Sequence, residues 1–178
     1  LNVVCRAIGE KNDAGFTATP IYPPFLSAPI HAERRLVSVP LVQSTQRWEW
    51  DFDAVDAALE GSSTKLFLLC HPHNPTGRAW QTDELTELAR LAEKHDLVIC
   101  SDEIHNGLLL SAPHQHRVFA TLGGDIAART ITLMAASKTF NIPGLGCAFA
   151  VISDASLRRK FTTAMRGIVP HVNALGMV

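Results

Sequence analysis

The chain has 178 residues, of which 47% are hydrophobic, so it is long enough to bury one substantial core. A formal net charge of −1 and the lack of a Lys/Arg run argue against nucleic acid or an acidic membrane surface as a partner. No stretch approaches the roughly 20 apolar residues that span a bilayer, and the N-terminus lacks a basic region followed by an apolar signal core. We therefore expect a single domain over residues 1–178 whose partners are small molecules or proteins.

The cysteines indicate a reducing compartment. Cys5, Cys70, Cys100 and Cys147 are scattered, without a Cys-x-x-Cys pair. Three of them lie within or at the end of apolar runs, where Cys behaves as a small hydrophobe. This usage favours a cytoplasmic location.

Short apolar and β-branched runs alternate with helical patterns along the chain. The runs predict strands at residues 15–19, 35–39, 65–70, 97–101, 130–134 and 147–152. Alternation of strands and helices is typical of crossover units and a largely parallel sheet. The sequence therefore predicts an α/β fold, a three-layer αβα sandwich with a mostly parallel sheet.

The helical segments lie between these strands. Helices are predicted at residues 1–9, 23–31, 53–61, 82–95 and 155–166. In the clearest of them, apolar residues recur on one helix face and Thr82 can cap the first turn. Trp48, Trp50 and Phe52 alternate with a strand-like period, which indicates a structural role.

Three polar clusters follow predicted strands. They are His-Pro-His-Asn-Pro-Thr-Gly at 71–77, Ser-Asp-Glu-Ile-His at 101–105 and Ser-Lys-Thr-Phe at 137–140. Ligands of open α/β sheets bind outside the carboxyl ends of the strands, so an amide, a carboxylate and an amine are expected to converge there. Lys138 is expected at the end of a buried strand, where burial disfavours the charged amine and a Schiff base with a carbonyl cofactor becomes plausible.

In order and spacing, these clusters resemble the three signatures of fold-type I pyridoxal-phosphate enzymes. Three further segments resemble the cystathionine β-lyase-like carbon–sulfur lyases, a branch of the class I/II aminotransferase family: Ile-Tyr-Pro-Pro-Phe at 21–25, Arg-Trp-Glu-Trp-Asp-Phe-Asp at 47–53 and Asn-Ile-Pro-Gly-Leu at 141–145. The resemblance runs along nearly the whole chain.

The resemblance implies a pyridoxal 5'-phosphate site built from five residues. Lys138 would hold the cofactor covalently and, once released, take the α-proton of the substrate. Asp102 would pair with the protonated pyridine nitrogen. Asn74 and, less typically, His105 would donate to the phenolic oxygen, while the ring of Tyr22 would stack on the pyridine.

The activity implied is β-elimination on a cysteine S-conjugate such as cystathionine, giving pyruvate, ammonia and a thiol. Two alternatives stay open: a class I/II aminotransferase, and the aminotransferase-like sensing domain of a transcription regulator. The resemblance also implies a homodimer acting on amino-acid substrates. It further implies that the chain is cut at both ends. A phosphate-binding loop would precede it, and a small domain carrying a substrate-carboxylate Arg would follow it. A third alternative is therefore that this piece, without both flanking parts, binds nothing.

Two positions depart from the family pattern. Ala135 stands where the family often has Ser, and Gly146 stands where aminotransferases often carry a phosphate-binding Arg. The second departure favours a lyase-like relative.

A metal site is the competing interpretation of the histidines. The pairs His71/His73 and His114/His116 could bind a metal, but no Cys or carboxylate cluster completes a site. We therefore expect no metal.

Overall fold

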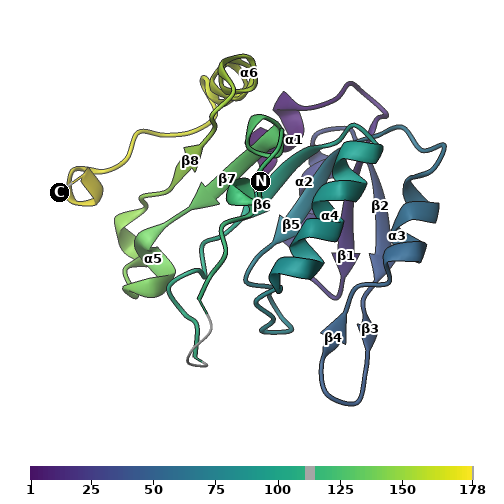
Figure 1. Cartoon of the computed structure of the whole chain (residues 1–178). Coiled ribbons are helices and arrows are strands. Elements are labelled where there is room, and N and C mark those ends of the chain that lie inside the picture. Colours follow the sequence, from purple (N-terminus) through teal and green to yellow (C-terminus); the bar gives the residue numbers. More distant parts are fainter. Residues whose placement is uncertain (111–114, 178) are drawn as a thin grey trace.

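The computed structural model describes residues 1–110 and 115–177, and its central feature is a six-stranded sheet (Figure 1). The strand order is β2 (Arg35–Pro40), β1 (Ala14–Thr19), β5 (Thr64–Cys70), β6 (Val98–Asp102), β7 (Thr130–Met134) and β8 (Phe149–Val151). All neighbours pair in parallel except β7 and β8, which are antiparallel. A separate hairpin pairs β3 (Val42–Gln43) with β4 (Trp48–Glu49). The predicted mostly parallel sheet is confirmed.

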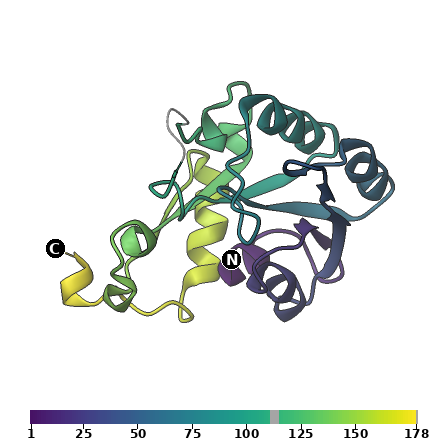
Figure 2. The same cartoon turned by 90° about the horizontal axis from the view of Figure 1, so that it is seen from below.

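Helices cover both faces of this sheet, as Figure 2 shows. One face packs against α1 (Asn2–Ala7), α2 (Pro24–His31) and α6 (Ala155–Met165), and the other against α3 (Phe52–Leu59) and α4 (Thr82–Lys94). The remaining turns are α5 (Ala136–Thr139), η1 (Phe119–Thr121), η2 (Ala127–Arg129), η3 (Pro143–Leu145) and η4 (Ala174–Met177). Among residues 1–110 and 115–177, no helix is both long and apolar enough to cross a membrane.

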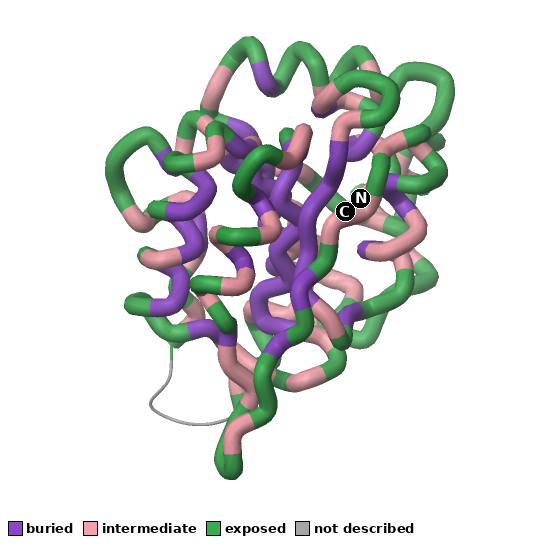
Figure 3. Tube along the Cα trace, turned by 90° about the vertical axis from the view of Figure 1, so that its right-hand side faces the viewer, coloured by how far each residue is buried: buried purple, intermediate pink, exposed green. Residues whose placement is uncertain are grey.

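The core is divided by the central strand β5. Its side chains alternate between the faces: Leu66 and Leu68 join the cluster under α1, α2 and α6, while Phe67 and Leu69 join the cluster under α3 and α4. Because both faces are covered, the strand is a continuous apolar run rather than an alternating one. Figure 3 shows the buried residues concentrated along the sheet.

Helix capping corrects two of the predicted boundaries. Helix α3 begins at Phe52, since the carboxylate of Asp51 accepts the N–H of Ala54 at 2.9 Å, so Phe52 does not continue a strand. Helix α4 begins with Thr82 as its first helical residue rather than its cap. The residue before it, Gln81, donates its backbone N–H to the carboxylate of Glu84 at 2.7 Å.

The aromatic residues at 48–52 therefore divide among three environments. Trp48 lies in the hairpin strand β4, and Phe52 starts α3. Trp50 lies between them, buried at 5.3 Å from the ring of Trp80. These positions fit the expected structural role of the three residues. The strand-like period, however, does not correspond to a single strand that contains all three.

The parallel register brings the ends of the middle strands to one edge. Cys70 at the end of β5 is aligned with Asp102 at the end of β6, which in turn is aligned with Leu133 of β7. The segments that follow these strands must therefore begin side by side. This edge carries all three polar clusters.

A charged cluster links α3 to α4 away from that edge. The carboxylate of Asp56 accepts hydrogen bonds from Nζ of Lys94 at 2.7 and 2.8 Å and from Nε2 of His95 at 2.6 Å. The hydrogen bonds from Lys94, and next those from His95, lower the pKa of Asp56 below its ordinary value.

The lowered pKa predicts a pH-dependent contribution to stability. A carboxyl group with a depressed folded pKa stabilises the fold above its unfolded pKa, and this contribution is lost as the pH falls through the folded value. Asp56→Asn should therefore lower the free energy of unfolding at neutral pH, with the deficit shrinking in acid. Urea unfolding of the natural full-length protein across a pH series checks this, and a deficit independent of pH would contradict it.

Candidate active site

The turn that carries Asn74 is held from both sides by its neighbours. The backbone N–H of Asn74 donates to Sγ of Cys70 at 3.3 Å, and the same thiol donates to the carbonyl of Pro72 at 3.4 Å. On the other side, the N–H of Tyr22 donates to the carbonyl of Asn74 at 3.0 Å. The loop after β1 is thus joined to the loop after β5, and the side chain of Tyr22 remains 47% exposed.

Asp102 ends strand β6 with a poorly compensated carboxylate. Its backbone carbonyl accepts the N–H of His71 at 3.0 Å, which fixes the main chain. Among the described residues, its carboxylate accepts one long hydrogen bond, from the N–H of Ile104 at 3.4 Å. Burial raises the pKa of Asp102, outweighing the opposing effects of that N–H and of His105. The carboxylate therefore has room for a further donor or a cation.

Lys138 is not at the end of a buried strand, as we had expected. Strand β7 ends at Met134, and Lys138 lies exposed in the following helix α5. The expected burial was wrong because the chain turns into a helix before reaching the lysine. The amine is therefore accessible from solvent.

A glycine contact joins this helix to the segment that carries His105. A Cβ atom added at Gly107 would lie 2.5 Å from Oγ1 and 2.6 Å from Cγ2 of Thr139, the neighbour of Lys138. Only a residue without a side chain permits this approach. The segment after β6 and the lysine helix are therefore in direct contact.

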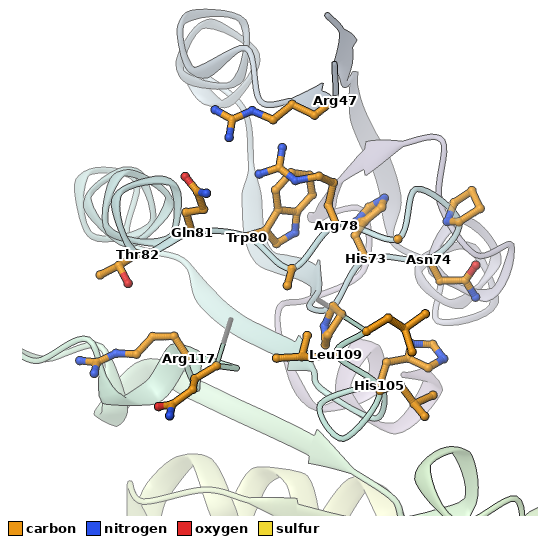
Figure 4. A pocket seen from close by; sticks show the side chains of 17 residues that line it. Arg47, His73, Asn74, Arg78, Trp80, Gln81, Thr82, His105, Leu109 and Arg117 are labelled. Atoms are coloured by element: carbon orange, nitrogen blue, oxygen red, sulfur yellow. The ribbon is translucent and has the colours of Figure 1, made fainter. Parts of the chain in front are cut away.

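A pocket of about 840 Å³ opens beside Asn74 and His105, both of which line it (Figure 4). Its wall includes Trp80, whose ring lies 4.9 Å from the guanidinium carbon of Arg78. Arg78 is held in turn by Glu84, with 2.5 Å between the charged groups. Tyr22, Asp102 and Lys138 lie outside this lining.

The structure thus brings the five predicted residues to one edge through backbone contacts and strand register. No hydrogen bond joins two of their side chains within the described residues. An accessible amine, a partly buried carboxylate, an amide and an imidazole at one sheet edge suit a ligand with a carbonyl group, a basic ring nitrogen and an oxygen acceptor.

The histidines considered as metal ligands are engaged in hydrogen bonds. Nε2 of His71 lies 3.0 Å from the carbonyl of Arg117, and its Nδ1 accepts the N–H of Trp80 at 3.4 Å. Burial, aided by His116, lowers the pKa of His71 to about 4, so the ring is neutral. His73 contacts the carbonyl of Pro20 at 2.9 Å.

No group of three potential ligands is arranged for a metal in the part of the chain that the structure describes. His114 lies outside the described residues.

Sequence reasoning missed the contacts of three residues at this edge, Glu103, Gly107 and His116, although His116 had been considered as a metal ligand. Glu103 is buried beside Asp102 and lies 2.6 Å from His116. The position of Glu103 directly after an apolar strand could have indicated a buried carboxylate, which needs a hydrogen-bond partner. The neighbouring sequence does not indicate that His116 is this partner.

Comparison with known proteins places the chain in a family. Residues 1–174 match the family model described as "Aminotransferase class I and II". The chain is 36% identical over 166 residues to "Cystathionine beta-lyase PatB" of Bacillus subtilis (strain 168), covering 93% of this chain and 43% of that protein.

Two solved structures are closely similar. The crystal structure of OvoB superposes with a TM-score of 0.94 at 46% identity, over 98% of this chain and 46% of that one. Cystalysin from Treponema denticola, a structure that contains pyridoxal 5'-phosphate, superposes with a TM-score of 0.91 at 32% identity, over 98% of this chain and 45% of that one.

These relatives agree on the family, and all of them are longer than this chain. The chain spans less than half the length of PatB, OvoB and cystalysin. Within that span the match runs almost from end to end, and it includes all three polar clusters. The chain belongs to the class I and II aminotransferase family, in its branch of cystathionine β-lyase-like carbon–sulfur lyases of fold type I.

Proposed function

We propose that the protein containing this chain is a pyridoxal-phosphate-dependent lyase that eliminates a thiol from a cysteine S-conjugate such as cystathionine. The net reaction consumes one water and yields the thiol, pyruvate and ammonia. The observation that carries the proposal is the convergence of Asn74, Asp102 and the Lys138 helix on one sheet edge, in a chain similar to PatB and cystalysin. We further propose a cytoplasmic homodimer, as the family resemblance implies.

The residues at the edge fit this cofactor. The carboxylate of Asp102 is partly buried, its pKa is raised, and it can accept a further hydrogen bond from the protonated ring nitrogen. Asn74 and His105 offer donors for the phenolic oxygen, and the exposed ring of Tyr22 offers a stacking surface. Lys138 supplies the amine that would bind the aldehyde covalently. When bound, pyridoxal phosphate supplies a ring that withdraws electrons from the α-carbon of an amino acid.

Lys138 also has the role of base in this proposal. Its free amine takes the proton from the α-carbon, the electron pair of that C–H bond forms the Cα–Cβ double bond, and the Cβ–S bond breaks with its electrons on sulfur. Asp102, kept ionised by the positive charge it faces, holds the ring nitrogen protonated. Asn74 would help to orient the ring by donating its side-chain amide to the phenolic oxygen.

Gly146 favours elimination over transamination as the main activity. It has φ = 59° and ends the η3 turn in the left-handed region, where residues with a side chain are strained. A phosphate-binding Arg of the kind that aminotransferases often carry at this place would therefore be strained in this backbone conformation. Transamination is the alternative, and a keto acid formed without stoichiometric ammonia would reveal it.

Replacing the lysine tests cofactor and reaction together. In the natural full-length protein, Lys138→Ala should abolish the visible absorbance band and lower pyruvate release from cystathionine by at least about a thousandfold, since both the covalent link and the base are lost. Lys160→Ala, at an exposed position of α6, serves as the control and should leave both unchanged. A band without pyruvate from the wild type would instead indicate transamination or sensing.

Asp102 should give cofactor binding a pH dependence. As the pH falls through its raised pKa, Asp102 becomes protonated and loses its attraction for a cationic ring nitrogen. The affinity of the wild type for the cofactor should therefore begin to fall at a pH higher than that at which an ordinary carboxyl group is protonated. Asp102→Asn should bind about tenfold to a hundredfold more weakly at neutral pH, since a hydrogen bond to a charged group contributes about 1.5–3 kcal/mol. The variant should lack the acid-side decline. Cofactor titration at several pH values measures this, and parallel pH profiles for the two proteins would argue against the role.

The contact between Gly107 and Thr139 predicts a steric effect on the lysine helix. Gly107→Ala should displace α5 and lower kcat by about tenfold or more, because small misplacements of a reacting group are costly. Gly144→Ala is the matched control, since its Cβ would meet open space. Steady-state kinetics decide the matter, and equal rates for the two variants would show that the contact is unimportant.

A further inference from the structure

A fully buried carboxylate lies directly after the partly buried Asp102. Glu103 is fully buried, with 0% of its surface exposed. Its Oε1 accepts the hydroxyl of Ser101 at 2.9 Å and the N–H of Phe119 at 3.0 Å, and its Oε2 lies 2.6 Å from Nε2 of His116. Three donors therefore compensate this carboxylate, whereas residues 1–110 and 115–177 offer one donor to the carboxylate of Asp102.

The two adjacent carboxylates point to opposite faces of the sheet. Asp102 is aligned with Cys70 and Leu133, which pack on the face covered by α1, α2 and α6. Glu103 contacts Phe119, which belongs to the core on the other face. The N–H of Glu103 also donates to the carbonyl of Leu133 at 2.9 Å, so the chain is still extended at this point.

His116 connects Glu103 to the neighbouring strand end. Its ring stacks on that of His71, with 4.4 Å between centroids and 29° between planes. His71 in turn contacts the carbonyl of Arg117 at 3.0 Å and donates its backbone N–H to the carbonyl of Asp102. The ends of β5 and β6 and the segment before η1 are thereby joined around one carboxylate.

The contact with Glu103 sets the position of the His116 ring. Nδ1 of His116 is buried and has no hydrogen-bond partner in the described part of the chain, so among those residues the contact with Glu103 is the hydrogen bond that the ring makes. A hydrogen bond to a buried carboxylate is among the stronger ones, and removing its donor leaves charge unsatisfied. The pair should therefore hold a single arrangement.

From this arrangement we infer that Glu103 and His116 are positioning residues for the cofactor edge. Consecutive residues of an extended chain are coupled in direction, so anchoring Glu103 on one face fixes where Asp102 points on the other. The same anchor sets the start of the segment that leads to His105. This inference rests on the proposed function, because what it positions is the carboxylate for the ring nitrogen.

Two substitutions at His116 separate hydrogen bonding from ring stacking. His116→Phe keeps an aromatic ring on His71 but removes the donor, while His116→Gln keeps an N–H near the place of Nε2 and removes the ring. In the natural full-length protein, His116→Phe should raise the Kd of pyridoxal phosphate at least about tenfold and shift the pH titration of the visible band. His116→Gln should stay within about threefold of the wild type.

The chain offers a matched control in His95, which makes a hydrogen bond of the same length, 2.6 Å, to Asp56 at a remote surface. His95→Phe should lower the urea midpoint of the cofactor-free protein and leave the Kd and the band titration unchanged. An equal rise in Kd for both His116 variants would overturn this inference and leave the proposed function standing. The same would hold if the visible band of His116→Phe titrated as in the wild type. A wild-type protein without any visible band would overturn the proposed function and this inference with it.

Discussion

The parallel register of the middle strands is the constraint on which the site depends. Because Cys70, Asp102 and Leu133 are aligned across the sheet, the chain segments that follow them begin at the same level. Residues distant in sequence are thereby brought to one edge, although no hydrogen bond joins the side chains of two predicted site residues in the described part of the chain. The two cores hold this register, since each of the central strands is covered on both faces.

At the edge, neighbouring acids have different electrostatic environments. Within the described residues, Glu103 accepts hydrogen bonds from three donors, whereas the carboxylate of Asp102 accepts one long hydrogen bond and has a pKa raised by burial. One carboxylate is therefore committed to structure and the other remains open to a ligand. This difference follows from the alternation of an extended chain between two sheet faces with different neighbours.

Much of this organisation could be predicted from the sequence, because it depends on local patterns. Apolar runs located the strands of the main sheet, and the motifs after them located Asn74, Asp102 and Lys138. The exposure of Lys138 could not be predicted, since it depends on where β7 turns into α5. The contacts of Glu103 with His116 and of Gly107 with Thr139 join separate loops, and no periodicity encodes such pairings.

The central claim is that the lysine of this edge carries the cofactor. It is tested most directly by reducing the natural full-length protein with borohydride in the presence of pyridoxal phosphate, followed by peptide mapping with mass spectrometry. One stoichiometric phosphopyridoxyl modification is expected, on the peptide that contains Lys138. Modification spread over surface lysines, or absent from Lys138, would contradict it.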